Sequence, residues 1–265
     1  MMTLIAALVA VLATIPVVAI VVTASLLRVP IRHGSIYETV QGFWARAMVR
    51  GGGVRVQLHG AEHIQQSAAC VYVANHVSWF DVFCLASVLP RWSFVAKAEL
   101  RKIPIFGRGA EAVGTIFVER TNRRAALKMY EAASVRIREG ASVVVYAEGT
   151  RGDGYALRPF KKGPFVLAIS AGVPIIPVVI MGTREVMRRG QWRVTPGVVH
   201  MHFLDPIPTA DLQYTDRDRL VGQVWSRMAA CLSSDYGIES DRRNARGAPE
   251  PSDSVTPVDV GVVTQ

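Results

Sequence analysis

The sequence predicts an α/β fold with a mostly parallel mixed sheet flanked by helices. Two patterns indicate this class: apolar runs of strand length recur along the chain, and stretches of helical periodicity separate several of them. The 265 residues, half of them apolar, suit one such domain with a short appendage. The expected strands are Val54–Leu58, Val71–Ala74, Ser93–Ala96, Thr115–Val118, Ser142–Tyr146, Ile175–Ile180 and Val198–Phe203.

The first expected element is an uncharged apolar helix from Leu4 to Leu27. At ~1.5 Å per residue it would be about 36 Å long, enough to cross a hydrocarbon core of roughly 30 Å. We expect a retained membrane helix, because Met1–Thr3 lacks the basic region of a cleaved signal peptide. Pro16 leaves open a kinked helix that enters only one leaflet. Arg28 and Arg32 follow, which predicts a cytoplasmic location for the rest of the chain.

A second helix is expected over Tyr37–Arg50, where apolar residues recur at helical spacing. Next to a membrane helix, this pattern predicts an amphipathic element at the membrane interface, and packing against the soluble domain is the alternative. Gly51–Gly53 should end the helix. We therefore expect an N-terminal membrane unit over residues 1–50.

The predicted α/β domain covers residues 51–236. Its clearest helix is Asn122–Glu139, with Gly140 as the C-cap, and its last helix is Arg217–Leu232. Residues 237–265 are polar and rich in Pro, Gly and Ser, which predicts a disordered tail.

The charge balance favours anionic partners. Thirty Lys and Arg against 21 Asp and Glu give a net charge of +9 at pH 7, which is typical of proteins that bind nucleic acid, an anionic lipid surface, or a phosphate- or CoA-bearing substrate. Aromatic residues are not interleaved with the basic ones, and an apolar anchor does not suit nucleic-acid binding, so we expect no nucleic-acid partner. Cys70, Cys84 and Cys231 are widely spaced, which predicts neither a disulfide framework nor a zinc site.

The segment CVYVANHVSWFD, Cys70–Asp81, carries the first candidate catalytic group. Its apolar run ends at Ala74, so His76 should lie at the C-terminal edge of the sheet, where α/β proteins place ligands. Ser78 and Asp81 have capping-box spacing, which predicts a helix that starts at Ser78. From that turn the Asp81 carboxylate can reach the imidazole, fix its tautomer and leave the other ring nitrogen as a base. An ordinary helix cap beside a loop histidine gives the same pattern.

Three further strand ends carry cations. In SVVVYAEGTRGDG an apolar strand runs into a turn whose glycine permits a sharp bend and whose arginine offers bidentate donors for phosphate. GTIFVER brings Arg120 to a strand end, and SFVAKAEL does the same for Lys97. A single such cation is typical of a solvated surface, but three of them beside a His–Asp pair indicate an anion-binding site. The residues of the turn are Glu148, Gly149, Thr150 and Arg151.

Together these motifs resemble the 1-acyl-glycerol-3-phosphate acyltransferase family, the lysophospholipid acyltransferases. The resemblance covers about Val54–Leu204 and rests on four ordered blocks: NHVSWFD, GTIFVER, AEGTR and VPIIPVVI. It implies a glycerophosphate acyltransferase-like fold with a membrane helix pair at the N-terminus, and Pro177 of the fourth block near the acyl site. Ala147 departs from the family, which usually has proline before the glutamate. The implied catalytic residues are His76 and Asp81, and the implied substrate-binding residues are Lys97, Arg120, Glu148, Gly149, Thr150 and Arg151.

The resemblance also implies an activity: transfer of a fatty acyl group from acyl-CoA or acyl carrier protein to the sn-2 hydroxyl of lysophosphatidic acid, in phospholipid biosynthesis. His76 would take the hydroxyl proton while backbone N–H groups near the helix start stabilise the oxyanion. The implied partners are membrane phospholipids, the lysophospholipid acceptor and the acyl donor, with no cofactor or metal. The implied location is the inner (plasma) membrane with the domain on the cytoplasmic face. Another acceptor such as lyso-ornithine lipid, and a non-catalytic basic membrane-binding module, are the alternatives.

Two weaker patterns favour no site. Gly107-x-Gly109-x-x-Ala112 fits a dinucleotide fingerprint, but the segment before it is a poor strand. His200 and His202 share one strand face, and two ligands without a third rarely hold a metal, so a strand surface is the favoured interpretation. The sequence contains neither a GxSxG elbow nor a P-loop, which argues against a serine hydrolase or an NTPase.

Overall fold

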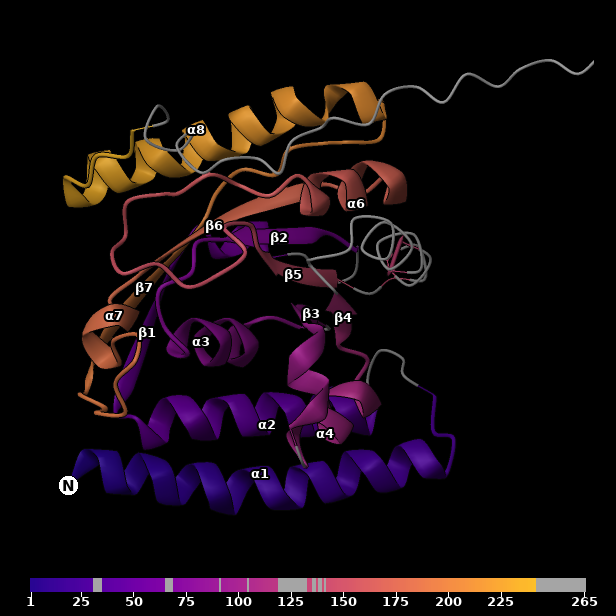
Figure 1. Cartoon of the computed structure of the whole chain (residues 1–265), viewed down its shortest axis with the longest axis vertical. Coiled ribbons are helices and arrows are strands. Elements are labelled where there is room, and N and C mark those ends of the chain that lie inside the picture. The colour runs from indigo at the N-terminus through magenta and orange to yellow at the C-terminus, as the bar shows by residue number, and fades with distance from the viewer. Residues whose placement is uncertain are drawn as a thin grey trace, which may run out of the picture.

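A mixed sheet of seven strands, in the order β1-β7-β6-β2-β5-β3-β4, forms the centre of the part of the chain that the structure describes (Figure 1). The computed structural model describes residues 1–30, 35–64, 69–90, 92–103, 105–118, 133, 134, 137, 140 and 142–241. Neighbouring strands are parallel except for the antiparallel pair β6–β7, which confirms the predicted mostly parallel mixed sheet. The strands are β1 (Val54–His59), β2 (Val71–Ala74), β3 (Trp92–Lys97), β4 (Ile116–Val118), β5 (Ser142–Tyr146), β6 (Ile175–Met181) and β7 (Gly197–Phe203).

Helices cover both faces of the sheet. In Figure 1, α6 and α8 lie above it, while α3, α2 and α1 follow one another below it. Short 3₁₀ turns at Ala61–His63, Ala98–Lys102 and Tyr214–Asp216 complete the connections. The helices are α1 (Met2–Leu26), α2 (Ile36–Gly51), α3 (Phe80–Val88), α4 (Phe106–Ala112), α6 (Gly163–Ala171), α7 (Thr183–Val186) and α8 (Arg217–Tyr236).

The central strands are buried on both faces, so their sequences are continuously apolar. Alternate residues of a strand point to opposite faces of the sheet. In β2, Val71 and Val73 therefore join the core under α6 and α8, while Tyr72 and Ala74 join the core on the α3 side. All four side chains are fully buried. Two complete cores hold the C-terminal ends of β2, β5 and β6 in fixed positions.

The N-terminal helices pack on each other and on the domain. Helix α2 lies between α1 and α3 and buries Ala45, Met48 and Val49. Its apolar residues thus pack against the α/β domain, which was the alternative to a place at the membrane interface. Among the described residues only α1 is long and apolar enough to cross a membrane, and α2 is the second, amphipathic helix of the expected N-terminal pair. A Cβ on Gly51 would lie 2.8 Å from the Val9 side chain, and the missing side chain therefore lets α1 and α2 approach closely.

Three expectations about local structure have different outcomes. Helix α3 starts at Phe80, two residues after the expected Ser78, because the Asp81 carboxylate folds back onto the preceding turn. The Gly107–Gly109 segment forms α4, where a Cβ would collide with the Arg101 carbonyl or with Val18 of α1. Its glycines therefore serve close packing. Most of the expected helix 122–139 and the tail beyond residue 241 lie outside the described residues.

Candidate active site

His76 lies in the turn after β2, and Asp81 lies in the first turn of α3. The His76 Nδ1 atom is 2.7 Å from Asp81 Oδ2. A carboxylate only accepts hydrogen bonds, so we assign the ring proton to Nδ1, which leaves Nε2 unprotonated and able to act as a base. The structure therefore brings the two predicted catalytic residues into contact.

The Asp81 carboxylate is fully buried and accepts from four donors. Besides His76, its Oδ2 atom accepts the backbone N–H groups of Val77 at 2.7 Å and Ser78 at 2.8 Å, and its Oδ1 atom accepts the Thr183 hydroxyl. These bonds fix the carboxylate under the imidazole. They also occupy the N–H groups of Val77 and Ser78, so the expectation that backbone groups near the helix start stabilise an oxyanion is wrong for these two.

The turn after β5 holds His76 from its other side. The His76 N–H donates to Glu148 Oε1 at 3.2 Å, and the Gly152 N–H donates to the His76 carbonyl at 2.7 Å. The other Glu148 oxygen accepts from Arg158 Nε at 2.6 Å. Burial raises the pKa of Glu148, and Arg158 opposes that rise. Both oxygens of Glu148 thus bind protein groups, which is the geometry of a positioning residue, and its predicted contact with substrate stays a prediction.

Other residues of the same two turns complete the framework. Gly149 has φ +80° and donates its N–H to the Tyr146 carbonyl, which makes the sharp bend after β5. The Asn75 side chain exchanges two hydrogen bonds with the backbone of Ile180 in β6. Ala147, at the place of the usual proline, donates its N–H to the Ala74 carbonyl at 3.3 Å, a bond that proline cannot form.

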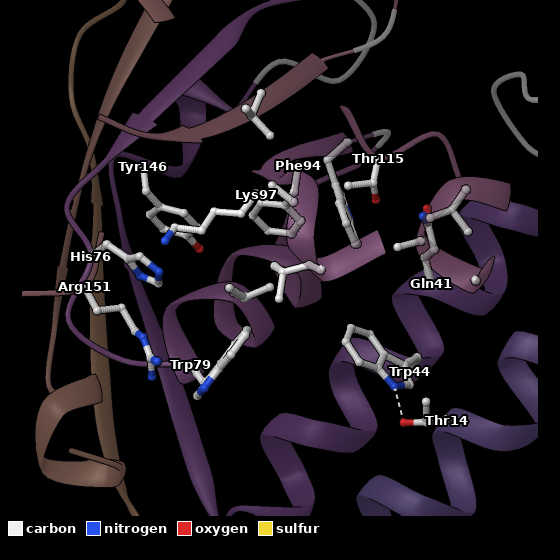
Figure 2. Close-up of a pocket in the computed structure, with 18 of the residues that line it drawn as sticks. Thr14, Gln41, Trp44, His76, Trp79, Phe94, Lys97, Thr115, Tyr146 and Arg151 are labelled. Carbon is white, nitrogen blue, oxygen red and sulfur yellow. Dashed lines mark hydrogen bonds between the residues drawn. The ribbon is translucent and has the colours of Figure 1, made fainter. Parts of the chain in front are cut away.

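A pocket of about 390 Å³ opens beside His76, and Figure 2 shows many of the side chains that line it. His76, Lys97 and Arg151 gather at one end, while Thr14, Gln41 and Trp44 lie at the other. Its walls come from the ends of β3 and β5, from α1, α2 and α4, and from the residue that follows α4. The apolar lining residues among them include Val17, Val18, Val21, Trp44, Ala110 and Val113. Gly149 and Thr150 also line it, whereas Arg120 lies outside the described residues.

Two arginines stand at the cationic end of the pocket. The Arg151 guanidinium lies 4.8 Å from the centre of the Trp79 ring, a distance typical of a cation–π contact. Burial, and then the neighbouring Arg189, lowers the pKa of Arg151. Arg189 donates to the Arg151 carbonyl at 3.0 Å and lies 3.5 Å from Asp153. No carboxylate among the described residues pairs with Arg151, so its donors can bind a substrate anion.

Tyr146, the last residue of β5, supports the imidazole. Its ring stacks on His76 with centroids 3.9 Å apart and lies nearly parallel to the Phe94 ring, with centroids 5.9 Å apart. Its buried hydroxyl has no hydrogen-bond partner among the described residues. Burial raises the pKa of Tyr146 well above its usual value, so the hydroxyl remains protonated.

Sequence reasoning missed Thr183, Arg189 and Tyr146. Thr183 is 102 residues from Asp81 and Arg189 follows a short helix, so no local pattern connects either with the dyad. The consecutive arginines at 188 and 189 were the available signal for a cationic wall. Pro177, expected near the acyl site, is buried in β6 beside Val73 and is not among the residues that line the described pocket.

The histidine strand face is more crowded than the sequence indicated. Helix α8 brings Cys231 and Asp235 to His202, with potential ligand atoms within 4.8 Å of one another, and His59 stacks on His202 at 4.2 Å. The two His202 ring nitrogens already contact Tyr236 at 2.6 Å and Asp235 at 3.4 Å. These contacts attach α8 to β7.

Comparisons with known proteins identify the family of this chain. A family profile described as Acyltransferase matches residues 55–181, which include the dyad and the turn after β5, so the chain carries an acyltransferase domain. Human 1-acyl-sn-glycerol-3-phosphate acyltransferase beta is 34% identical over 198 residues, 72% of this chain and 70% of that protein. The chain therefore belongs to the 1-acyl-sn-glycerol-3-phosphate acyltransferase family, which confirms the resemblance seen in the sequence.

Other relatives differ in how much of their length is matched. The chain spans 40% of the chloroplastic 1-acyl-sn-glycerol-3-phosphate acyltransferase BAT2 of Brassica napus and 61% of the bovine alpha protein, at 34% identity to each. Among solved structures, the 1-acyl-sn-glycerophosphate (LPA) acyltransferase PlsC from Thermotoga maritima superimposes with a TM-score of 0.73 over 91% of this chain and 97% of that chain. At 24% identity this similarity establishes a shared fold.

Proposed function

We propose that this protein transfers a fatty acyl group from a thioester to the sn-2 hydroxyl of lysophosphatidic acid and so forms phosphatidic acid. The observation that carries the proposal is that one pocket joins a cluster of cations, the imidazole of the His76–Asp81 dyad and a long apolar wall. A phosphomonoester, a reacting hydroxyl and an acyl chain need these three environments in this order.

The chemical step uses His76 as the general base. As Nε2 takes the proton of the sn-2 hydroxyl, the oxygen attacks the thioester carbonyl carbon. Collapse of the tetrahedral intermediate breaks the carbon–sulfur bond, and the imidazolium returns its proton to the departing thiolate. Asp81 holds the ring and stabilises the imidazolium, and general-base help of this kind is worth roughly 10²–10⁴ in rate. The donor is the thioester of a fatty acid with either CoA or acyl carrier protein.

The pocket gives each end of the acceptor a suitable place. Lys97, Arg151 and Arg189 would bind the phosphate, with guanidinium groups suited to bidentate contacts. Arg120 remains a proposed further contact. The apolar wall from α1, α2 and α4 would receive an acyl chain. Binding the lipid at both ends would hold its hydroxyl beside His76 Nε2. The reaction of the hydroxyl with the bound thioester would then be effectively unimolecular.

Helix α1 is proposed to lie in one membrane leaflet along its length. It packs antiparallel on α2, joined by the Trp44–Thr14 hydrogen bond of 3.0 Å. An α1 perpendicular to the membrane would carry Arg46 and Arg50 of α2 into the hydrocarbon, at roughly 2.5–3.5 kcal/mol for each charge near the centre. Its exposed apolar side chains, among them Leu4, Leu8, Leu12 and Ile15, would instead face the lipid tails.

The activity test uses the full chain in lipid vesicles, with lysophosphatidic acid as acceptor and either acyl-CoA or acylated acyl carrier protein as donor. Lipid mass spectrometry should detect phosphatidic acid, and His76→Ala should lower the rate roughly 10²–10⁴-fold. His63→Ala, a histidine that does not line the pocket, is the matched control. Equal rates for the wild type and His76→Ala would refute the proposal, and faster transfer to lyso-ornithine lipid would refute the acceptor.

The proposed location is the cytoplasmic face of the inner (plasma) membrane. An in-plane α1 leaves the N-terminus on the same side as the catalytic domain, whereas a spanning α1 puts it on the opposite side. Protease digestion of intact cells and of inverted vesicles, with a tag before Met1 and antibodies to the domain, distinguishes the two. Protection of the tag in inverted vesicles would contradict the in-plane arrangement.

A further inference from the structure

The loop Arg188–Arg193, between α7 and β7, presents an unusual surface. All six residues of this loop are exposed, and Trp192 is 83% exposed. Arg188 and Arg193 form no ion pair with any described carboxylate. A tryptophan this exposed contributes little to the core, and its combination with neighbouring arginines is typical of membrane–water interfaces, where aromatic rings sit at headgroup level.

The same loop borders a concave site. A shallow cavity of about 290 Å³ is lined by Arg188, Arg193, Gln191, Thr195 and Glu185. One oxygen of Glu185 accepts the Tyr155 hydroxyl at 2.6 Å, so part of its charge is compensated within the protein. The remaining groups offer two guanidinium ions, an amide and a hydroxyl, which are suitable partners for a phosphate with a polar substituent.

The loop is tied to the end of the molecule where α1 begins. The Val194 N–H donates to the Thr3 hydroxyl of α1 at 3.1 Å, and Figure 1 shows the loop below α7, at the same end as the N-terminus. An α-helix is roughly 10 Å wide. If α1 lies among the lipid tails, a loop attached beside its start is therefore held at about the level of the headgroups.

We propose that the loop Arg188–Arg193 docks on the membrane surface, with Trp192 at the interface and an anionic phospholipid headgroup bound between Arg188 and Arg193. This proposal rests on the proposed residence of α1 in the membrane and is independent of acyl transfer. The loop would fix the rotation of the domain about α1, and since Arg189 lines the active-site pocket, it would keep that pocket facing the lipid.

The test measures full-chain protein on vesicles of phosphatidylcholine, with and without phosphatidylglycerol. At about five-fold in affinity per arginine near an anionic surface, Arg188→Gln/Arg193→Gln should weaken association with phosphatidylglycerol vesicles roughly 30-fold. Association with pure phosphatidylcholine should not change, and high salt should remove the difference, since the Debye length is only about 3 Å at 1 M. Arg217→Gln/Arg219→Gln changes the same charge on α8, on the other side of the sheet, and is the matched control.

Brominated lipids report on Trp192 itself. Wild-type fluorescence minus that of Trp192→Phe isolates this ring among five tryptophans, and lipid brominated near the headgroup should quench it more than lipid brominated near the chain end. The corresponding difference for Trp225→Phe, which reports on a buried ring of α8, should show no quenching. If vesicles bind the protein but Trp192 is unquenched, membrane residence holds and the loop proposal is overturned. Equal loss of binding in both arginine double variants would overturn the headgroup site.

Discussion

Replacing Asp81 with asparagine removes one charge from the dyad and keeps its shape. The buried carboxylate accepts two backbone N–H groups and the His76 Nδ1–H at Oδ2. An amide has one acceptor oxygen and one NH₂ group, which can only donate. If the NH₂ group faced Val77 and Ser78, it would meet two backbone N–H donors, so the oxygen must face them. The imidazole therefore keeps its tautomer in Asp81→Asn, and the Thr183 hydroxyl can rotate to accept from the amide nitrogen.

The expected loss comes from the missing charge. Imidazolium and carboxylate centres about 4 Å apart attract by about 4 kcal/mol at an effective dielectric constant near 20. The neutral amide retains a hydrogen bond, so we expect the activation barrier to rise by about 2–4 kcal/mol and kcat to fall roughly 30- to 1,000-fold. KM should not change, because Asp81 is fully buried and does not line the pocket. Weaker bonds to Val77 and Ser78 should lower the free energy of unfolding by about 1–3 kcal/mol.

The assay is the initial rate of phosphatidic acid formation in vesicles at saturating acceptor, with thermal unfolding measured on the same samples. Asp218→Asn, an exposed carboxylate on α8 that pairs with Lys162, should keep the wild-type kcat. A folded Asp81→Asn enzyme with kcat within about threefold of wild type would refute charge stabilisation of the imidazolium. A rise in KM with unchanged kcat would show that the carboxylate acts on binding instead.

Three other substitutions test the supporting structure. Gly182→Ala should lower the free energy of unfolding by roughly 3–4 kcal/mol, because at φ +95° its Cβ would lie 2.2 Å from the Val198 carbonyl. Gly190→Ala, at φ +77° in open space, should cost only about 1 kcal/mol, and similar losses in the two variants would contradict the steric reasoning. Tyr146→Phe should raise the free energy of unfolding by about 1 kcal/mol by removing a buried, unpartnered hydroxyl and should keep activity; lost activity would mean that the hydroxyl contacts substrate. Burial, together with His59 and His200, lowers the pKa of His202, so below the unfolded pKa of about 6.5 the unfolded state binds more protons and stability falls with falling pH. Unfolding midpoints in His202→Gln should depend less on pH between 7.5 and 5.5, and an unchanged dependence would exclude His202 as the cause.

The sheet was predictable because buried parallel strands leave a strong sequence signal. Each predicted strand lies within one residue of an observed one. The central strands β2, β5 and β6 are buried on both faces and are therefore short apolar runs with clear ends. The His76–Asp81 contact was also predictable, because both residues belong to one turn and one helix start. In both cases the deciding interactions are local in the sequence.

Interactions between distant segments left no such signal. The carboxylate of Glu148 looks like a substrate ligand in the motif AEGTR, yet in the structure it binds the His76 N–H and Arg158. Helices α4 and α7 have seven and four residues, too few for a periodic pattern. The amphipathic pattern of α2 was correct, but a pattern of apolar positions does not reveal whether lipid or α3 covers them.

The four-residue spacing between His76 and Asp81 follows from the packing of α3. The Asp81 carboxylate accepts hydrogen bonds from the N–H groups of Val77 and Ser78 and from the His76 imidazole at the same time. Asp81 is the second residue of α3, and from this position its side chain points back to the turn that precedes the helix. The side chain of the first residue, Phe80, points toward α2 instead. A Cβ on Gly52, at the end of α2, would lie 2.6 Å from the Phe80 ring, and the ring also packs edge-on against Phe83. Phe80 thereby anchors α3 on α2, the helix that carries α1. Phe80, next to the dyad carboxylate, thus connects the turn that holds His76 and Asp81 through α2 to the apolar helix α1.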